Sequence, residues 1–303
     1  MLSTVAMVLS AMVGLSLVYL LVRTIQGHPV ERRVVFIYIG LAVVLPLLMN
    51  KTLPLPITKD VIKFYDQLEK LQPGSKVLCA FDYDPPSAPE LQPMAVAFLK
   101  YAFKNDLKII IMGLWPQGPQ QAQQAIEEAM LDPIIAAKNL VQGEDWVNLG
   151  FQSGNEFVIQ SMGTEFKRMF PKDNRHIAYG DIPLLQDVVN FSNVDFVINF
   201  SAGKPGTSEW VQFGVDRFGF EMVAGNTAVQ APMMYPYLRT GQLKGLLGGM
   251  TGAAEFEKIL NEKGKASTFL LAQTFAHATV IIFIIIGNLA FFSSRKKKMA
   301  GTS

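Results

Sequence analysis

The stretch "KVLCAFDYDPPSAPELQP", residues 76–93, contains a short apolar run, a turn with two aspartates and the beginning of a helix. Apart from Lys76, residues 76–81 are all apolar, which is typical of a strand buried on both faces of a sheet. Pro89 and Glu90 suit the first turn of the helix that follows. This order of strand, polar turn and helix predicts the first unit of an α/β sheet.

The same order recurs along the middle of the chain. Apolar runs that suit buried strands occupy residues 107–115, 145–151, 194–201 and 221–225. Segments that suit helices lie before and between the strands, at 57–72, 89–105, 118–139, 155–170, 183–191 and 208–219. Strands that alternate with helices predict a mostly parallel sheet that is covered on both faces. We therefore expect a Rossmann-like, three-layer α/β domain over residues 50–267.

Sheets of this kind bind ligands outside the carboxyl ends of their strands, where loops and helix N-termini converge. Nine residues are expected at this rim, because each ends or follows a predicted strand: Asp82, Asp84, Trp115, Gln117, Ser201, Gly203, Lys204, Asn226 and Thr227. The competing interpretation is that these residues only form the polar loops that every parallel sheet requires.

Asp82 and Asp84 are the candidate metal ligands of this rim. Side chains two residues apart on a strand point to the same face, so both carboxylates could contact one Mg²⁺ or Ca²⁺ ion. With Lys204 as an electrophile, the pair would suit a metal-dependent hydrolase or transferase. The pair resembles the opening motif of haloacid-dehalogenase-type phosphatases, but two prolines follow it, and proline lacks the N–H that a phosphate loop needs. The alternative is that one aspartate caps the next turn and the other pairs with Lys204.

Other catalytic signatures are absent from the sequence. It has no G-x-G-x-x-G after a strand, and no G-x-x-x-x-G-K-[ST], G-x-S-x-G or H-E-x-x-H motif. His176 is the only histidine within the predicted domain. Because no complete catalytic set is present, no cofactor is firmly implied, and the sequence favours a non-catalytic protein.

The composition indicates that part of the chain is solvated by lipid. Half of the 303 residues are apolar, only 17% are charged, and the mean hydropathy is +0.25, which is high for a soluble domain. The net charge of +2 gives no electrostatic reason to expect a nucleic-acid partner. The single cysteine, Cys79, excludes an intrachain disulfide.

Three segments are candidates for crossing a bilayer. Residues 5–22 carry no charge; a signal peptide is the competing interpretation, but no basic residue precedes the run and no clear cleavage site follows it. Residues 34–49 are shorter and could instead be buried or lie at the membrane interface. Residues 268–292 form the longest uncharged segment. The expected order is an N-terminal membrane region, 1–49, the α/β domain, a C-terminal membrane helix and a basic tail, 293–303.

Basic residues in short connections tend to stay on the cytoplasmic side of a membrane. Arg23, Arg32 and Arg33 lie in the link between the first two segments, and the tail begins with the basic run 295–298. Three crossings place both regions on one side, which predicts a multi-pass protein of the cell membrane with a cytoplasmic tail and an extracytoplasmic domain. This inference requires 34–49 to cross. Lysines near the ends of the domain act against it: Lys51, Lys59, Lys258, Lys263 and Lys265.

Glycines recur at every fourth position in residues 235–265, at Gly241, Gly245 and Gly249. On a helix they would form a stripe that permits close packing, and we expect this stripe to serve self-association. A plain loop interrupted by glycine is the alternative interpretation.

Four segments together carry a resemblance: "FDYDPPSAPELQPMAVAFLKYAF", "LWPQG", "EDWVNLGF" and "AGNTAVQAPMMYPYLRTGQLKGLLGGMTGAAEFE". They resemble an uncharacterised family of prokaryotic membrane proteins with the same layout of span, domain and span. The resemblance covers most of residues 76–257. It implies a prokaryotic setting and retained membrane spans, and it brings no activity and no catalytic residue.

These observations predict a membrane-anchored, non-catalytic protein whose extracytoplasmic domain binds a partner or a small ligand and assembles with copies of itself. Its expected partners are the lipid bilayer and further copies or other members of a membrane complex. The alternative is a divalent-metal-dependent hydrolase or transferase that uses Asp82 and Asp84.

Overall fold

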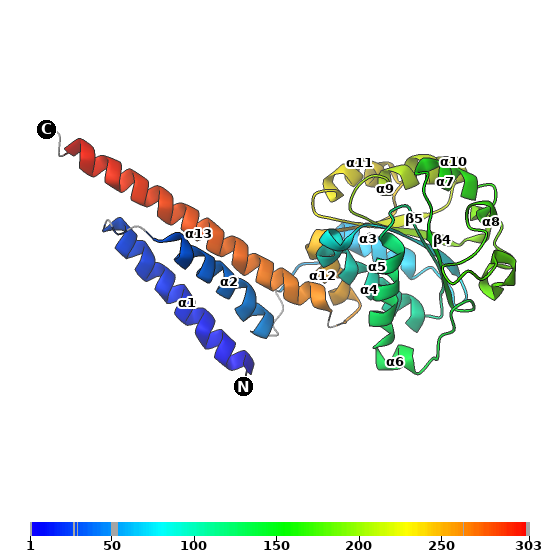
Figure 1. The fold of residues 1–303 in the computed structure, drawn as a ribbon, viewed down its shortest axis with the longest axis horizontal. Coiled ribbons are helices and arrows are strands. Elements are labelled where there is room, and N and C mark those ends of the chain that lie inside the picture. The colour runs from blue at the N-terminus through cyan, green and yellow to red at the C-terminus, as the bar shows by residue number, and fades with distance from the viewer. Residues whose placement is uncertain (1, 27, 29, 50–53, 263, 301–303) are drawn as a thin grey trace. The chain divides into compact units, whose positions relative to one another are not determined.

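The computed structural model describes residues 2–26, 28, 30–49, 54–262 and 264–300. The chain divides into two compact units, one formed by residues 1–54 with 267–303 and the other by residues 55–266. Figure 1 shows the first as helices alone and the second as an α/β domain.

The α/β domain is built on one sheet of six parallel strands in the order β3-β2-β1-β4-β5-β6. The strands are β1 (Lys76–Asp82), β2 (Lys108–Gly113), β3 (Trp146–Phe151), β4 (Phe196–Ser201), β5 (Met222–Asn226) and β6 (Leu246–Gly248). The chain moves outward from β1 to β3, returns to β4 beside β1, and then moves outward to β6. This is the strand order of the Rossmann fold, so the predicted fold class is confirmed.

Helices cover both faces of the sheet. They are α3 (Lys59–Leu68), α4 (Ala88–Lys104), α5 (Gly118–Met130), α6 (Pro133–Ala136), α7 (Glu156–Met162), α8 (Phe166–Met169), α9 (Thr207–Glu209), a π-helical turn (Trp210–Val215), α10 (Asp216–Phe218), α11 (Ala231–Thr240) and α12 (Gly249–Ile259). Short 3-10 turns lie at Pro85–Ser87, Tyr179–Asp181, Pro183–Leu185 and Phe191–Asn193. In Figure 1, α7 and α9–α11 lie on one side of the sheet, and α4–α6 and α12 lie on the other.

Alternating side chains of β1 enter the two cores. Leu78 and Ala80 belong to the cluster that includes Trp210 and Met234 on the α7–α11 side. Phe81 faces the other way, where its ring lies 5.5 Å from that of Phe200. All of these side chains are fully buried, as the run of apolar residues in this strand predicts.

Two secondary-structure predictions were wrong in detail. The helix expected at 183–191 is replaced by 3-10 turns, because the side chains of Asn190 and Asn193 bind nearby backbone N–H groups that a helix would use. The helix expected at 155–170 is divided into α7 and α8. In addition, the short strand β6 was not predicted.

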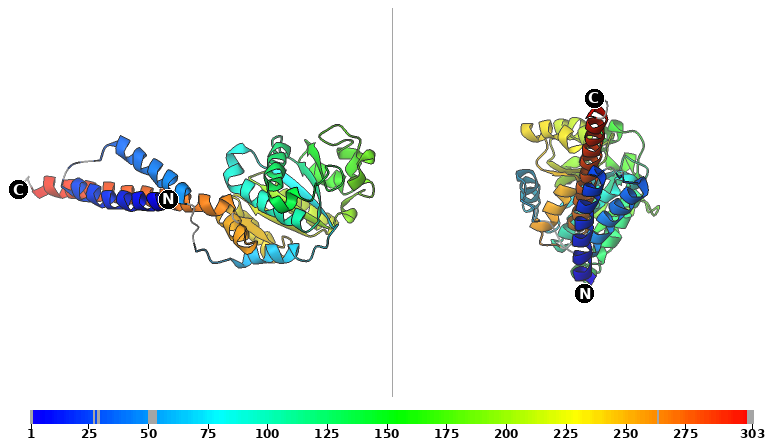
Figure 2. Two further views of the ribbon diagram at one scale, coloured as in Figure 1. Left: turned by 90° about the horizontal axis from the view of Figure 1, so that it is seen from below. Right: turned by 90° about the vertical axis from the view of Figure 1, so that its left-hand side faces the viewer.

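The other unit contains α1 (Leu2–Ile25), α2 (Arg32–Met49) and α13 (Lys265–Ala300), the last of which begins in the α/β domain. All three are long and apolar enough to cross a membrane, which confirms the prediction of three such segments. Tyr38 on α2 donates a hydrogen bond to Ser16 on α1 (2.6 Å) and its ring packs edge-on against Phe283 of α13. Figure 2 shows these helices from two further sides. Of the expected basic tail, residues 301–303 lie outside the described residues, as do Lys51 and Lys263.

Candidate functional site

The carboxyl ends of β1, β4 and β5 bring three of the predicted rim residues into one row. Asp82 is paired in register with Ser201, and Ser201 is paired with Asn226. The side chain of Asp82 faces the side of the sheet that Trp210 covers. All three residues of the row are completely buried, so the row lies beneath the rim of the sheet and not on its surface.

Three N–H donors surround the carboxylate of Asp82. Oδ1 accepts a hydrogen bond from the backbone N–H of Leu114 (2.7 Å). Oδ2 accepts hydrogen bonds from Nδ2 of Asn199 (2.7 Å) and from Nε1 of Trp210 (2.9 Å). The carboxylate therefore ties together the end of β2, the middle of β4 and the π-helical turn.

The network continues through amide and hydroxyl groups. Oγ1 of Thr207 donates to Oδ1 of Asn199 (2.6 Å) and accepts from Nδ2 of Asn226 (2.9 Å). Asn226 also donates to the carbonyl oxygen of Ser201 (3.3 Å). Asn199, Thr207 and Trp210 were not predicted as site residues. For Asn199 a signal was available, because a polar residue within the apolar run "VINF" must find partners inside the domain.

Burial raises the pKa of Asp82 to about 7 from its ordinary value of 3.8. The three N–H donors act in the opposite direction, and the nearby carboxylate of Glu209 adds a further upward effect. A carboxylate with a pKa near neutrality is a feature of many functional sites, although buried structural networks produce it as well. Asp82 is therefore a candidate for a pH-dependent group of this domain.

Asp82 and Asp84 do not converge on a shared position. The side chain of Asp84 accepts hydrogen bonds from the N–H and the Oγ–H of Ser87 and so caps the turn before α4. Both oxygens of Asp82 face N–H groups, whose positive ends disfavour a cation. Within the described residues no group of three or more His, Cys, Asp or Glu residues is arranged to hold a metal ion. Lys204 is exposed and forms no salt bridge in the part of the chain that the structure describes.

The loop after β4 closes over the buried network. Nε1 of Trp115 donates to the carbonyl oxygen of Pro205 (2.7 Å), and the indole lies against Gly203, where an added Cβ would be 3.1 Å from the ring. Gly206 packs against Ser201 so closely that a Cβ there would lie 1.9 Å from Oγ. The loop after β4 and the side chain of Trp115 therefore lie over the buried row.

The remaining predicted rim residues are divided between the surface and the interior. Gln117 is exposed just before α5, and Thr227 is buried just after β5. The backbone N–H of Thr227 donates to the carbonyl oxygen of Ser201 (3.4 Å), so Thr227 continues the closed edge.

The predicted glycine stripe is wrong, because Gly241, Gly245 and Gly249 do not share a helix. Gly241 ends α11 with a φ of +79°, and Gly249 begins α12 with a φ of +58°. Gly245 lies in the loop between them, where an added Cβ would be 2.3 Å from Cα of Phe64. The alternative of a loop interrupted by glycine is the one observed, and the two buried glycines serve packing within the domain.

A second polar cluster surrounds α12. Oε2 of Glu255 accepts hydrogen bonds from the N–H (2.8 Å) and Oγ1 (2.6 Å) of Thr58, just before α3. Oε1 of Glu257 accepts one from the N–H of Ala266 (2.9 Å), in the first turn of α13. Both glutamates are at least 97% buried. The two segments through which the chain enters and leaves this domain are therefore both bound to α12.

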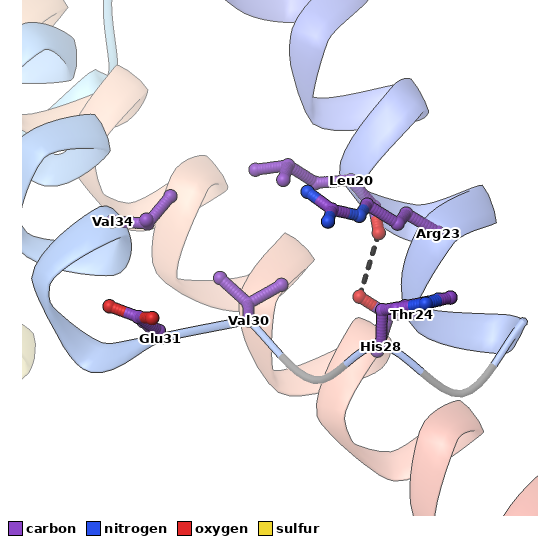
Figure 3. A pocket seen from close by; sticks show the side chains of 7 residues that line it. All are labelled: Leu20, Arg23, Thr24, His28, Val30, Glu31 and Val34. Atoms are coloured by element: carbon purple, nitrogen blue, oxygen red, sulfur yellow. Dashed lines mark hydrogen bonds between the residues drawn. The ribbon is translucent and has the colours of Figure 1, made fainter.

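A further cavity lies in the helical unit, where α1 turns towards α2. Its volume is about 310 Å³. Figure 3 shows Arg23 and Thr24 on α1 and Glu31 and Val34 across the cavity from them. Oγ1 of Thr24 donates to the carbonyl oxygen of Leu20 (2.7 Å), a bond within α1. Arg23 and Glu31, which line the cavity, are exposed, so the cavity is open to its surroundings.

Comparison of the chain with protein-family models, curated proteins and solved structures gave no match.

Proposed function

We propose that this protein is a membrane-anchored, non-catalytic binding protein whose extracytoplasmic α/β domain binds a protein partner and assembles with copies of itself. The observation that carries the proposal is the state of Asp82. The carboxylate at the switch point of the sheet, where Rossmann-like proteins bind their ligands, is buried and already holds three N–H donors.

The anchoring part of the proposal rests on three helices that are apolar enough to cross a bilayer. Its orientation rests on the arginines of the link between α1 and α2 and on the basic run 295–298, which the positive-inside rule assigns to the cytoplasm. An odd number of crossings between these two regions and the domain then leaves the domain on the outer side.

A protein partner is favoured over a small ligand because the carboxylate at the rim already has its partners, while apolar side chains are exposed beyond the end of β5. Val229, which follows β5, is 84% exposed, and Met233 and Tyr235 on α11 are 53% and 40% exposed. We call these three residues the α11 surface. Tyr and Met are enriched at protein interfaces, and exposed apolar side chains at the beginning of α11 and just before it mark a candidate contact.

Light scattering on the full-length protein in detergent tests this proposal. We expect an oligomer for the wild type and a smaller species for the double variant Val229→Asp, Met233→Asp. The matched control is Leu131→Asp, Ile134→Asp, which places the same charges on side chains that are 80% and 60% exposed at the end of α5 and on α6. A strict monomer of the wild type at high concentration would count against self-assembly.

The metal-dependent hydrolase or transferase remains the alternative proposal, and it has less support. Asp82 and Asp84 have separate partners, and neither is paired with Lys204 in the part of the chain that the structure describes. Calorimetric titration of the full-length protein with Mg²⁺ and with Ca²⁺ distinguishes the two proposals. Saturable binding that is lost in Asp82→Asn, Asp84→Asn would favour the enzyme; an absence of heat favours the binding protein.

A further inference from the structure

A cavity of about 150 Å³ lies between α4, the end of α5 and the beginning of α13. One wall is apolar and consists of Pro93, Val96 and Ala97 on α4. The other walls carry charges of both signs, among them Lys100, Glu128 and Lys265. A small cavity with an apolar wall and charges of both signs suits a zwitterionic group attached to an apolar body.

The charges of the cavity are paired with one another. Nζ of Lys265 lies 2.8 Å from Oε2 of Glu128, and the Lys265 side chain is 59% exposed. Nζ of Lys100 lies 3.7 Å from Oε2 of Glu262 and has no hydrogen-bond partner among the described residues. Of these four side chains only Lys265 is exposed, so it can leave Glu128 at small cost. Lys100 and Glu262 are half-buried, and the other oxygen of Glu262 pairs with Lys104, so Glu262 keeps a partner when Lys100 turns to a ligand.

The position of Lys265 along the chain places this cavity near lipid headgroups. Lys265 is the first residue of α13 and also the first residue of the candidate membrane span Lys265–Phe292. The uncharged part of that span begins at the next residue, Ala266, about 1.5 Å further along the helix. The headgroup layer on each side of a bilayer is about 5–7 Å thick, so Lys265 falls within it.

We propose that this cavity binds the headgroup of a phospholipid that carries a primary amine. The phosphate would lie between the ammonium groups of Lys100 and Lys265, and the amine would donate hydrogen bonds to Glu128 and Glu262. The two lysine–glutamate pairs are thereby exchanged for lysine–phosphate and amine–glutamate pairs with no change in total charge. This inference rests on the membrane crossing of α13 that the proposed function includes.

The same chemistry disfavours the other common headgroups. A choline headgroup has a quaternary nitrogen without N–H, so it cannot donate hydrogen bonds to Glu128 or Glu262. A glycerol headgroup supplies a phosphate but no cation, so displacing Lys265 would leave Glu128 without its cation. A serine headgroup also carries a primary amine, but its carboxylate would face Glu128 and Glu262. Phosphatidylethanolamine is therefore the lipid that fits this cavity.

The test uses the full-length protein in nanodiscs of phosphatidylcholine that contain equal added fractions of phosphatidylethanolamine and phosphatidylglycerol. Native mass spectrometry of the released protein identifies the retained lipids. We expect phosphatidylethanolamine to be retained in excess over its fraction. In Lys100→Met, which keeps the apolar stem and loses the ammonium, this excess should fall about fivefold. Lys100→Arg should keep most of it.

The matched control is Lys63→Met, which removes an exposed lysine of α3 outside the cavity and should leave the excess unchanged. Soluble glycerophosphoethanolamine, added to the nanodiscs, should compete if the headgroup itself is recognised. Retention of all lipids in proportion to their fractions, or the same excess in Lys100→Met as in the wild type, would overturn the inference. Extraction of the protein by alkaline carbonate would instead overturn the membrane anchoring on which the proposed function depends.

Discussion

The buried carboxylates at the carboxyl edge of the sheet and those on α12 receive their hydrogen bonds from different parts of the chain. At the carboxyl edge of the sheet, Asp82 receives its three hydrogen bonds from groups that belong to the domain's own core. At α12, Glu255 and Glu257 receive theirs from Thr58 and Ala266, which belong to the segments that lead towards the apolar helices. The first network lies at the strand ends where Rossmann-like folds bind ligands. The second holds Thr58 and Ala266, close to the points where the chain enters and leaves the domain.

This comparison indicates which region of the protein is the better candidate for binding a ligand. A polar strand end does not by itself make a ligand site, because buried donors can use up every acceptor there. Charged side chains that line a cavity, such as Lys100 and Lys265, lie instead near the beginning of the candidate span. The predictions below measure how much each region contributes.

The largest effect is expected at the closed rim. Asp82→Ala leaves three buried N–H donors without an acceptor, and we expect the free energy of unfolding to fall by about 3–5 kcal/mol. Urea unfolding followed by tryptophan fluorescence measures this for the domain, because Trp115, Trp146 and Trp210 all lie in it. The control is Asp84→Ala, which removes only the cap of one turn and should cost about 1 kcal/mol. Similar losses in the two variants would mean that the network is not what holds the rim.

The second prediction concerns pH. Because the pKa of Asp82 is raised to about 7 in the folded protein and is near 3.8 when unfolded, the folded state binds the proton more tightly. Stability should therefore fall as the pH rises from about 4 to about 7, by up to about 4 kcal/mol from this group. The difference between wild type and Asp82→Asn, measured across this range, isolates the effect.

Asp132 and Asp187 do not obscure that range. Hydrogen bonds to Lys104 and Lys76 lower the pKa of Asp132 and of Asp187, respectively. Their stabilising contributions are lost only as the pH falls below the ordinary aspartate value. A wild-type stability that is flat relative to Asp82→Asn between pH 4 and 7 would contradict the assignment.

The third prediction compares two glycines near α12. An added Cβ at Gly245 would lie 2.3 Å from Cα of Phe64, so Gly245→Ala should destabilise the domain by about 1–3 kcal/mol. Gly241 has open space around it, and Gly241→Ala should cost about 1 kcal/mol through its positive φ alone. If Gly245→Ala altered the oligomer measured by light scattering while leaving stability unchanged, the glycine would serve self-association after all.

The smallest effect is expected at the linker side. Glu255→Gln keeps one acceptor oxygen for Thr58 but loses the charge, so the loss should be about 1–2 kcal/mol. Hydrogen exchange should show faster opening of residues 54–60, and little change around Asp82. Equal increases in the exchange rate at residues 54–60 and around Asp82 would show that the two clusters open as one cooperative network.

Much of the fold could be predicted because the signals are local. The apolar run before Asp82 indicates a buried strand, and Pro89 and Glu90 mark the helix after it. The three residues of β6 are too few to produce a periodic signal, and the glycines around them were therefore interpreted as a helix. At 183–191, side chains of Asn190 and Asn193 override an apolar pattern that suited a helix.

The candidate site was predictable only in part. Register between β1, β4 and β5 brings Asp82, Ser201 and Asn226 together, as expected for parallel strand ends. The sequence pattern could not predict the hydrogen bond from Trp210 to Asp82, because Trp210 lies 128 positions further along the chain. Contacts between residues so far apart in the sequence depend on tertiary packing, so no spacing of residue types predicts them.

Cysteine labelling tests the central claim, that the membrane holds the chain at both ends and leaves the α/β domain outside the cytoplasm. Leu131→Cys places a thiol at a position that is 80% exposed and lies outside the α11 surface, and the native Cys79 is fully buried, so it gives little background. We predict that a membrane-impermeant maleimide labels Leu131→Cys in intact spheroplasts, whereas Ser303→Cys is labelled only after the membrane is permeabilised. Labelling of Leu131→Cys only after permeabilisation would place the domain in the cytoplasm and contradict the account.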